Sequence, residues 1–142
     1  MAHYPLRKAE WYRDARGWSE VAEQLRWLAR SNPRAARAIL NKIDTIRQVS
    51  FEEALRGPLL KKGSPTIYVL RVQSGSIAYR LPFFEPLCRG GELIVFTHCG
   101  KRDELDRAAY AALIESAEER RRDWIERNCG REDENGRDDE RR

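Results

Sequence analysis

Three short apolar segments, separated by turns, restrict the fold of this chain more than any other feature. Residues 67–73, 76–84 and 93–102 are rich in Ile, Val, Leu, Tyr and Phe, which favour strands. A turn at residues 73–75 and a connection at 86–92 join them, and both are too short to hold a crossover helix. The sequence therefore predicts antiparallel neighbours in one sheet.

Each of these segments also carries a basic residue at its centre or its end. Arg71 and Arg80 lie inside the first two segments, and Lys101 and Arg102 end the third. An arginine inside an apolar strand is costly unless it faces water or binds something, because a buried unpaired charge is strongly disfavoured. We therefore expect a sheet face that holds an anion, and RNA phosphate is the anion that we favour. The simpler alternative is a half-exposed sheet whose arginines face solvent.

The period of two along a strand sorts these side chains onto two faces. Arg71 and Arg80 fall on the same face, together with Gln73, Ser76 and Ala78. The opposite face is more apolar, and we expect helices to cover it. Its members are Tyr68, Leu70, Val72, Ile77, Tyr79, Leu81, Phe83, Ile94 and Phe96.

Two helices are predicted before the sheet. Ser19 is a good N-cap for a helix over about residues 20–30. Asn32 then caps a second helix, and Pro33 fits its first position. The apolar stripe of the second helix has helical spacing and consists of Ala36, Ile39, Leu40, Ile43 and Ile46. We expect the two helices to form an antiparallel hairpin.

A first strand within residues 5–13 and a last helix over about residues 104–127, capped by Asp103, complete the expected elements. The predicted fold class is α+β, with an N-terminal helical hairpin packed on a twisted antiparallel sheet of about four strands and a C-terminal helix. The chain length favours a single domain over residues 1–129. Residues 130–142 are almost wholly charged and polar, so we expect a disordered tail there.

Positive charge is concentrated in the predicted sheet region. Residues 56–102 hold eight Lys or Arg and two Glu, a balance of 8 − 2 = +6. Residues 103–129 hold five basic and eight acidic residues, a balance of 5 − 8 = −3. A local excess of this kind is typical of proteins that bind a polyanion, although a solvated charged surface would look the same in the sequence.

The cysteines indicate a cellular compartment rather than a site. Cys88, Cys99 and Cys129 have no metal-binding spacing and form no C-x-x-C motif. A few cysteines without a signal peptide are expected in a reducing cytoplasm. No segment approaches the roughly 18 apolar residues of a membrane span, so we expect no membrane partner. We also expect no metal ion and no other cofactor.

The order of the segments resembles the RelE/ParE superfamily of bacterial toxins. The matching pieces are a helical hairpin, a Lys-rich loop, the segments Ile-Tyr-Val-Leu-Arg-Val and Ala-Tyr-Arg, an apolar strand that ends in Lys-Arg, and an Ala-rich helix. The similarity covers roughly residues 10–120 and is greatest to the HigB-like, phage-derived branch. The implied fold is RelE-like. The implied function is the toxin of a type II toxin–antitoxin pair.

Most toxins of this superfamily are endoribonucleases that cleave mRNA at the ribosome without a metal ion and so inhibit translation. The resemblance therefore implies that activity for this chain. Two alternatives stay open, a ParE-like gyrase poison and a non-catalytic module of the same fold that binds nucleic acid or protein.

The resemblance also implies the residues of the site. By position, Arg71, Arg80 and Lys101 match catalytic residues, and Arg102 stands where the family usually has a second lysine. The implied RNA-binding residues are Lys61, Lys62 and Arg102. The family often has a His, one further residue and a Phe before its basic pair. Thr97 and Cys99 occupy those positions here, and His98 lies one place away. The period of two places His98 on the side of Phe96.

Metal-free RNA cleavage needs a base for the 2′-hydroxyl, cations on the phosphorane and an acid for the leaving 5′-oxygen. Arg71 and Arg80 suit the phosphorane, because a guanidinium grips two phosphate oxygens in a fixed fork. A lysine whose pKa neighbouring cations lower is a candidate base. His98 is a second candidate for acid–base work, since the ordinary histidine pKa is near neutral.

The implied partners are an antitoxin and mRNA on the ribosome, in the cytoplasm. We expect the antitoxin to be a helix-turn-helix protein encoded by an adjacent gene. An acidic or amphipathic segment of it would cover the basic region 56–102, and charge complementarity would speed the association.

Overall fold

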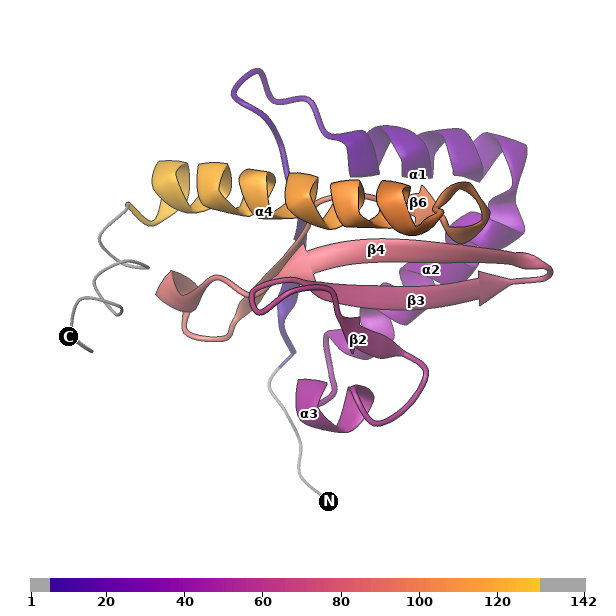
Figure 1. Cartoon of the computed structure of the whole chain (residues 1–142), viewed down its shortest axis with the longest axis horizontal. Coiled ribbons are helices and arrows are strands. Elements are labelled where there is room, and N and C mark those ends of the chain that lie inside the picture. Colours follow the sequence, from indigo (N-terminus) through magenta and orange to yellow (C-terminus); the bar gives the residue numbers. More distant parts are fainter. Residues whose placement is uncertain (1–5, 131–142) are drawn as a thin grey trace.

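A mixed β-sheet with helices on both faces forms the centre of the molecule (Figure 1). The computed structural model describes residues 6–130, so most of the predicted tail lies outside the described residues. The helices are α1 (Glu20–Ser31), α2 (Pro33–Ile46), α3 (Phe51–Ala54) and α4 (Arg107–Asn128), with short 3₁₀ turns at Leu87–Arg89 and Arg102–Glu104. The strands are β1 (Lys8–Trp11), β2 (Leu60–Lys62), β3 (Tyr68–Ser74), β4 (Ile77–Phe84), β5 (Leu93–Phe96) and β6 (Gly100–Lys101).

The sheet has six strands in the order β1-β5-β4-β3-β2, and β6 pairs with β4. β1 runs parallel to β5, and the other pairings are antiparallel. The α+β class is confirmed, but the prediction of a wholly antiparallel sheet of about four strands is wrong. The long connection between β1 and β5 permits a parallel pairing. β2 and β6 have three and two residues, too few for an alternating pattern to be read from the sequence.

The helix ends follow the predicted caps in two cases of three. The side chains of Ser19 and Asn32 accept hydrogen bonds from the first turns of α1 and α2, as the sequence predicted. α4 begins later than predicted, because Asp106 rather than Asp103 accepts the capping bond, from the Ala109 amide at 2.8 Å. The element order also differs from an N-terminal helical hairpin, since β1 precedes α1 and the short α3 follows α2.

Two apolar cores lie on opposite faces of the sheet. On one face, α1 and α2 pack against the strand residues that the period of two had assigned to the core, such as Leu70, Tyr79 and Phe96. On the other face, α4 packs against Val69, Phe84 and further residues. Figure 1 shows α1 and α2 on one side of the sheet and α4 on the other. The second face was expected to be open, and α4 covers a large part of it.

A disulfide joins Cys88 to Cys129 and closes a segment of 41 residues. It ties the connection between β4 and β5 to the C-terminal end of α4. Such a bridge is unusual in the reducing cytoplasm that the cysteine count predicted. Cys99 is free and buried, and burial raises the pKa of its thiol to about 12. Within residues 6–130, no helix combines the length and the apolar character that a membrane span requires.

Candidate anion-binding site

Arg71 and Arg80 lie directly opposite each other on β3 and β4. Residues paired in this way point to the same face, with their Cβ atoms about 4.5–5.5 Å apart. The shared face is the one that α4 covers farther along the strands, at Val69 and Phe84. Like charges opposite each other destabilise a sheet. The fold therefore keeps a costly pair of cations together.

Hydrogen bonds to the backbone hold both guanidinium groups in place. Arg71 donates from Nη2 to the carbonyl oxygens of Gly57 at 3.0 Å and Leu60 at 3.3 Å, and its Nε is buried without a partner among the described residues. Arg80 donates from Nη1 to the Tyr79 carbonyl at 3.0 Å. Within residues 6–130, no carboxylate forms an ion pair with either arginine. Their positive charges are therefore not neutralised within that part of the chain.

A third arginine adds to this positive field. Burial lowers the pKa of Arg80, and the charges of Arg102 and Arg71 lower it further, while Tyr110 acts in the opposite direction. An arginine stays charged despite such a shift, because its ordinary pKa is above 12. Arg102 therefore belongs with the arginine pair. The sequence analysis had assigned it to the site only because it stands where the family usually has a second lysine.

A hollow of about 450 Å³ lies beside the pair. Lys42 of α2 lines it together with both arginines, and none of the described residues that line it is acidic. The remaining wall consists of Pro58, Leu59, Val72 and Gln73. An anion that entered this hollow would meet three cations and a wall of mixed polar and apolar groups.

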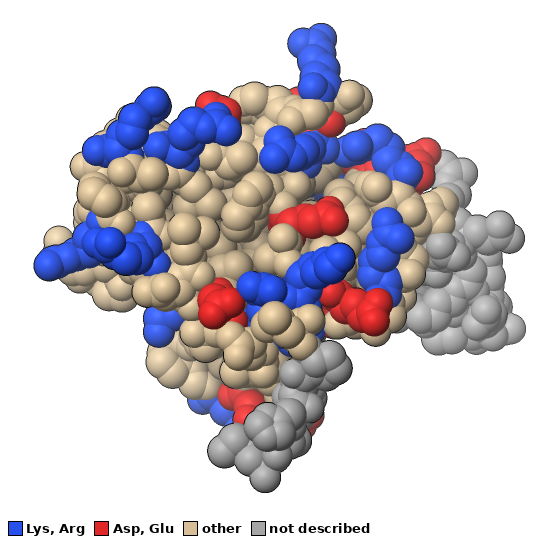
Figure 2. Space-filling model, turned by 180° about the vertical axis from the view of Figure 1, so that it is seen from behind, with Lys and Arg blue, Asp and Glu red and all other residues tan. Residues whose placement is uncertain are grey.

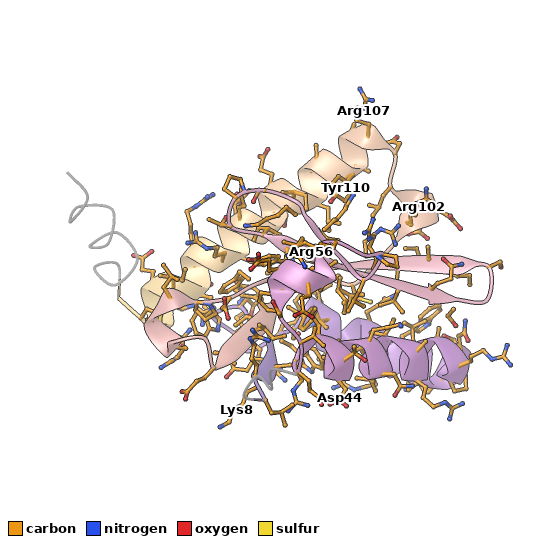
Figure 3. All side chains as sticks on the ribbon, turned by 90° about the horizontal axis from the view of Figure 1, so that it is seen from below. Lys8, Asp44, Arg56, Arg102, Arg107 and Tyr110 are labelled. Atoms are coloured by element: carbon orange, nitrogen blue, oxygen red, sulfur yellow. A yellow bond between two sulfur atoms is a disulfide. The ribbon has the colours of Figure 1, made fainter. Side chains whose placement is uncertain are left out.

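Lys61 and Tyr110 lie next to this cluster. Lys61 pairs with Val69 and so shares the face of Arg71, and its Nζ lies 4.2 Å from the centre of the Tyr110 ring. The Tyr110 hydroxyl is buried and has no hydrogen-bond partner among the described residues. A buried hydroxyl without a partner is unusual in a native protein and calls for an explanation. Figure 3 shows Tyr110 near the start of α4, with Arg102 on the segment before that helix.

Lys101 and Lys62 lie on the opposite face of the sheet. The register pairs Lys101 with Tyr79 and Lys62 with Tyr68, and both tyrosines face α1 and α2. Lys62 also donates from Nζ to the Pro65 carbonyl at 2.9 Å. The structure therefore does not bring these two lysines together with the arginines, although the sequence grouped them.

His98 is buried in a polar network between the sheet and α4. Its Nδ1 lies 2.8 Å from the Thr97 hydroxyl and its Nε2 lies 3.0 Å from the Ser116 hydroxyl. Only 5% of the residue is exposed, and burial together with the Arg120 charge lowers its pKa to about 3. The side chain is therefore neutral at physiological pH and holds α4 in place, so it is a poor candidate for acid–base catalysis.

The expected position of His98 was also wrong. The period of two placed it on the side of Phe96, which faces α1 and α2, yet it contacts Ser116 of α4. Residues 97–99 are not part of a strand, so the alternation stops at the end of β5.

Lys42 and Tyr110 are the members of the site that the sequence analysis missed. Lys42 lies on a predicted helix, and Tyr110 lies on another, each with no neighbouring motif. Only the packing of α2 and α4 against the sheet brings them to the arginines. No local pattern in the sequence identifies them.

In comparisons with known proteins, no family model, no curated protein and no solved structure matches this chain. The resemblance to the RelE/ParE superfamily therefore stays a prediction. What the site does has to be argued from its geometry.

The Lys42→Ala variant is expected to bind single-stranded RNA about 3- to 10-fold more weakly, since one phosphate contact is lost from an otherwise intact cluster. The affinity should be measured by fluorescence anisotropy at several salt concentrations, and the slope against salt should decrease by about one contact. Lys62→Ala is the matched control, because Lys62 does not line the hollow and its Nζ donates to the Pro65 carbonyl. Equal effects of the two variants would remove Lys42 from the site.

Proposed function

We propose that this chain is the RelE-like toxin of a type II toxin–antitoxin pair and acts as a metal-independent, ribosome-dependent mRNA endonuclease. The observation that carries the proposal is the pair of un-neutralised arginines, Arg71 and Arg80, beside a hollow that Lys42 also lines. Two adjacent guanidinium groups offer several donors to one phosphate group in a fixed geometry. The concentration of positive charge in residues 56–102 supports the same ligand class.

The proposed reaction is an attack of the RNA 2′-hydroxyl on its own phosphate. A base takes the hydroxyl proton, the new P–O bond forms, and the bond to the 5′-oxygen breaks as an acid protonates that oxygen. The products are a 2′,3′-cyclic phosphate and a free 5′-hydroxyl. Arg71 and Arg80 would stabilise the negative charge that develops on the phosphorane.

Lys61 and Tyr110 are the groups best placed to move the protons in this scheme. They contact each other. Tyr110 is close enough to Arg80 to raise its pKa, and the Tyr110 hydroxyl has no hydrogen-bond partner among the described residues. In the proposed scheme Lys61 is the base, and Tyr110 is the acid that protonates the leaving oxygen. Lys101 and His98 have no role in it, because neither lies at the arginine pair.

A non-catalytic RNA-binding module is the second candidate function. The low pKa of His98 favours it, since the site then lacks a histidine that can exchange protons near neutral pH. Such a module would use the same cations to hold RNA and would leave the RNA intact.

Induced expression of the chain is expected to stop translation and to produce new 5′ ends in cellular mRNA. Incorporation of radiolabelled methionine measures the first effect and primer extension measures the second. Unchanged translation without new 5′ ends would refute the proposal. RNA binding without cleavage would favour the non-catalytic module, and a DNA-damage response with intact mRNA would favour a gyrase poison.

The proposed physiological partner is an antitoxin from an adjacent gene, and the proposed location of the substrate is the ribosome in the cytoplasm. An acidic segment of that antitoxin would fit the hollow beside Arg71, because the hollow has no acidic lining residue.

A further inference from the structure

The outer edge of β1 carries backbone groups that no described residue pairs with. Among the described residues, β1 lies at one end of the sheet and pairs only with β5. The amides of Lys8 and Tyr12 donate to carbonyls of Glu92 at 2.9 Å and Phe96 at 2.8 Å. Because backbone groups alternate along a strand, the N–H and C=O groups of Ala9 and Trp11 point to the open side.

Hydrogen bonds to other parts of the molecule limit the unpaired edge of β1 at both ends. The amide of Arg7 donates to the Arg47 carbonyl at 3.1 Å, and the Arg47 side chain donates from Nε to the Arg7 carbonyl at 2.6 Å. At the other end, Arg127 donates from Nη2 to the Arg13 carbonyl at 2.5 Å. The free edge is therefore two residues long and has a defined register.

Two grooves follow this edge, one on each face of the sheet. The groove on the α2 side has a volume of about 420 Å³ and is mainly apolar, with Trp11, Leu40 and Ile43 in its wall. Leu40 is 48% exposed, although it is a large apolar residue on a packed helix. Figure 2 shows the molecule from the side of α1 and α2, where basic and acidic side chains border a largely uncharged area.

The groove on the α4 side has a different lining. Its volume is about 480 Å³, and its wall contains Glu10, Arg13, Arg127 and Asn128. Arg127 is paired with Asp123, whereas Arg13 has no ion pair with a carboxylate in the part of the chain that the structure describes. A ligand in this groove would meet polar groups, the positive charge of Arg13 and the negative charge of Glu10, which also has no ion pair among the described residues.

We propose that the outer edge of β1 binds an extended segment of another protein by adding a strand to the sheet. The segment has apolar side chains toward α2 and hydroxyl or carboxylate side chains toward α4, because the side chains of a strand alternate between the two faces. Main-chain hydrogen bonds to Ala9 and Trp11 supply the pairing, and the two grooves select the sequence.

A second copy of this chain fits the edge less well. An antiparallel pairing that uses both open residues places Ala9 opposite the second Trp11, and it then places Glu10 opposite the second Glu10. Like charges directly opposite each other are destabilising. The two neighbouring registers would require the backbone of Arg7, which Arg47 already occupies, or that of Arg13, whose carbonyl accepts from Arg127. The geometry therefore favours a different chain as the added strand.

This surface is separate from the arginine pair, since β5 lies between β1 and β4, the strand of Arg80, and Arg71 lies on the next strand, β3. A strand added to β1 would leave the hollow beside Arg71 open. The proposal therefore stands whether or not the chain cleaves RNA.

A synthetic peptide tests the proposal directly. The probe is acetyl-Thr-Val-Glu-Val-Thr-Val-Glu-Val-Thr-amide, and its binding to the full ¹⁵N-labelled chain is followed by NMR. We expect the largest shift changes at Ala9, Trp11 and Leu40. Two N-methylated versions, one at the valines and one at the intervening residues, should behave differently, because only one set of amides faces β1. Loss of binding in one version alone is the expected result.

Variants of the chain provide the second measurement. Ala9→Pro removes one outward N–H and no bond to β5, and proline is tolerated on an edge strand. We expect the dissociation constant of the peptide to rise about 3- to 10-fold. Leu40→Ser should weaken binding similarly, whereas Leu87→Ser is the matched control, since Leu87 is 44% exposed and lines neither groove.

Three results would overturn the proposal. The first is no binding of the peptide, and the second is equal binding of both N-methylated versions. The third is a dimer that light scattering detects for the natural chain and not for the Ala9→Pro variant, since the edge would then pair with a second copy.

Discussion

Under the proposed function, the Arg80→Ala variant is expected to cleave mRNA between about 10²- and 10³-fold more slowly than the natural chain, because it lacks a cation that would stabilise charge on the phosphorane. Arg80 lies opposite Arg71, and three arginines interact at this point. The initial rate on a ribosome-bound mRNA of defined sequence measures the effect. Recovery of growth after induction measures it in cells.

The stability of the Arg80→Ala variant separates a catalytic role from a structural one. Arg80 makes one backbone hydrogen bond and faces a like charge across the strand pair. Removing it relieves that repulsion, so the free energy of unfolding should stay the same or rise by up to about 1 kcal/mol. Arg30→Ala is a control that removes an exposed arginine at the end of α1. A fully active Arg80→Ala variant, or one that loses activity only because it unfolds, would remove Arg80 from the site.

Arg80→Lys adds a finer test of the same geometry. Lysine keeps the charge but has no planar fork, so bidentate contact with a phosphate is lost. We expect a rate between those of the natural chain and of Arg80→Ala. A rate equal to that of the natural chain would mean that the site uses charge alone.

The part of the fold that the sequence predicted is the part with a sustained local pattern. β3 and β4 alternate over seven and eight residues, which placed Arg71 and Arg80 on one face and Leu70 and Tyr79 on the other. Ser19 and Asn32 were predictable as helix caps for the same reason, since a cap needs only its own turn.

The sequence predictions fail where an element is too short to show a periodic pattern, or where the contact joins residues far apart in the sequence. β6 has two residues, so nothing in the sequence indicated that Lys101 pairs with Tyr79 and leaves the arginine face. The alternation ends with β5, which misplaced His98. Lys42 reaches the hollow through the packing of α2, a tertiary contact that no periodicity encodes.

The chain also separates two kinds of polar group that the sequence treated alike. Arg71 and Arg80 are half-buried, un-neutralised and adjacent to a hollow, whereas His98 is fully bonded and lies in a packed network. The arginine pair is suited to a ligand site, because two like charges opposite each other destabilise the sheet and a bound anion would neutralise them. The histidine makes sense as a support for α4, since both of its ring nitrogens lie within hydrogen-bond distance of a hydroxyl group.

The buried, neutral His98 is expected to make the protein less stable in mild acid. The free energy of unfolding should fall by about 2 kcal/mol between pH 6.5 and pH 4.5. Burial and Arg120 lower the pKa of His98 to about 3 in the folded chain, whereas the ordinary histidine pKa is 6.5. In this pH range the unfolded chain binds a proton at His98 and the folded chain does not. Stability must therefore fall as the pH falls, and it is fully retained only above about pH 6.5.

Urea unfolding at closely spaced pH values between 6.5 and 4.5 measures this loss. The His98→Gln variant should be less stable at pH 7, because it loses at least one of the bonds to Thr97 and Ser116, but its stability should change little across the same range. His3→Gln is the control for histidine content, since His3 is the other histidine of the sequence. An equally steep loss in the His98→Gln variant would show that carboxylates, and not His98, govern the response to acid.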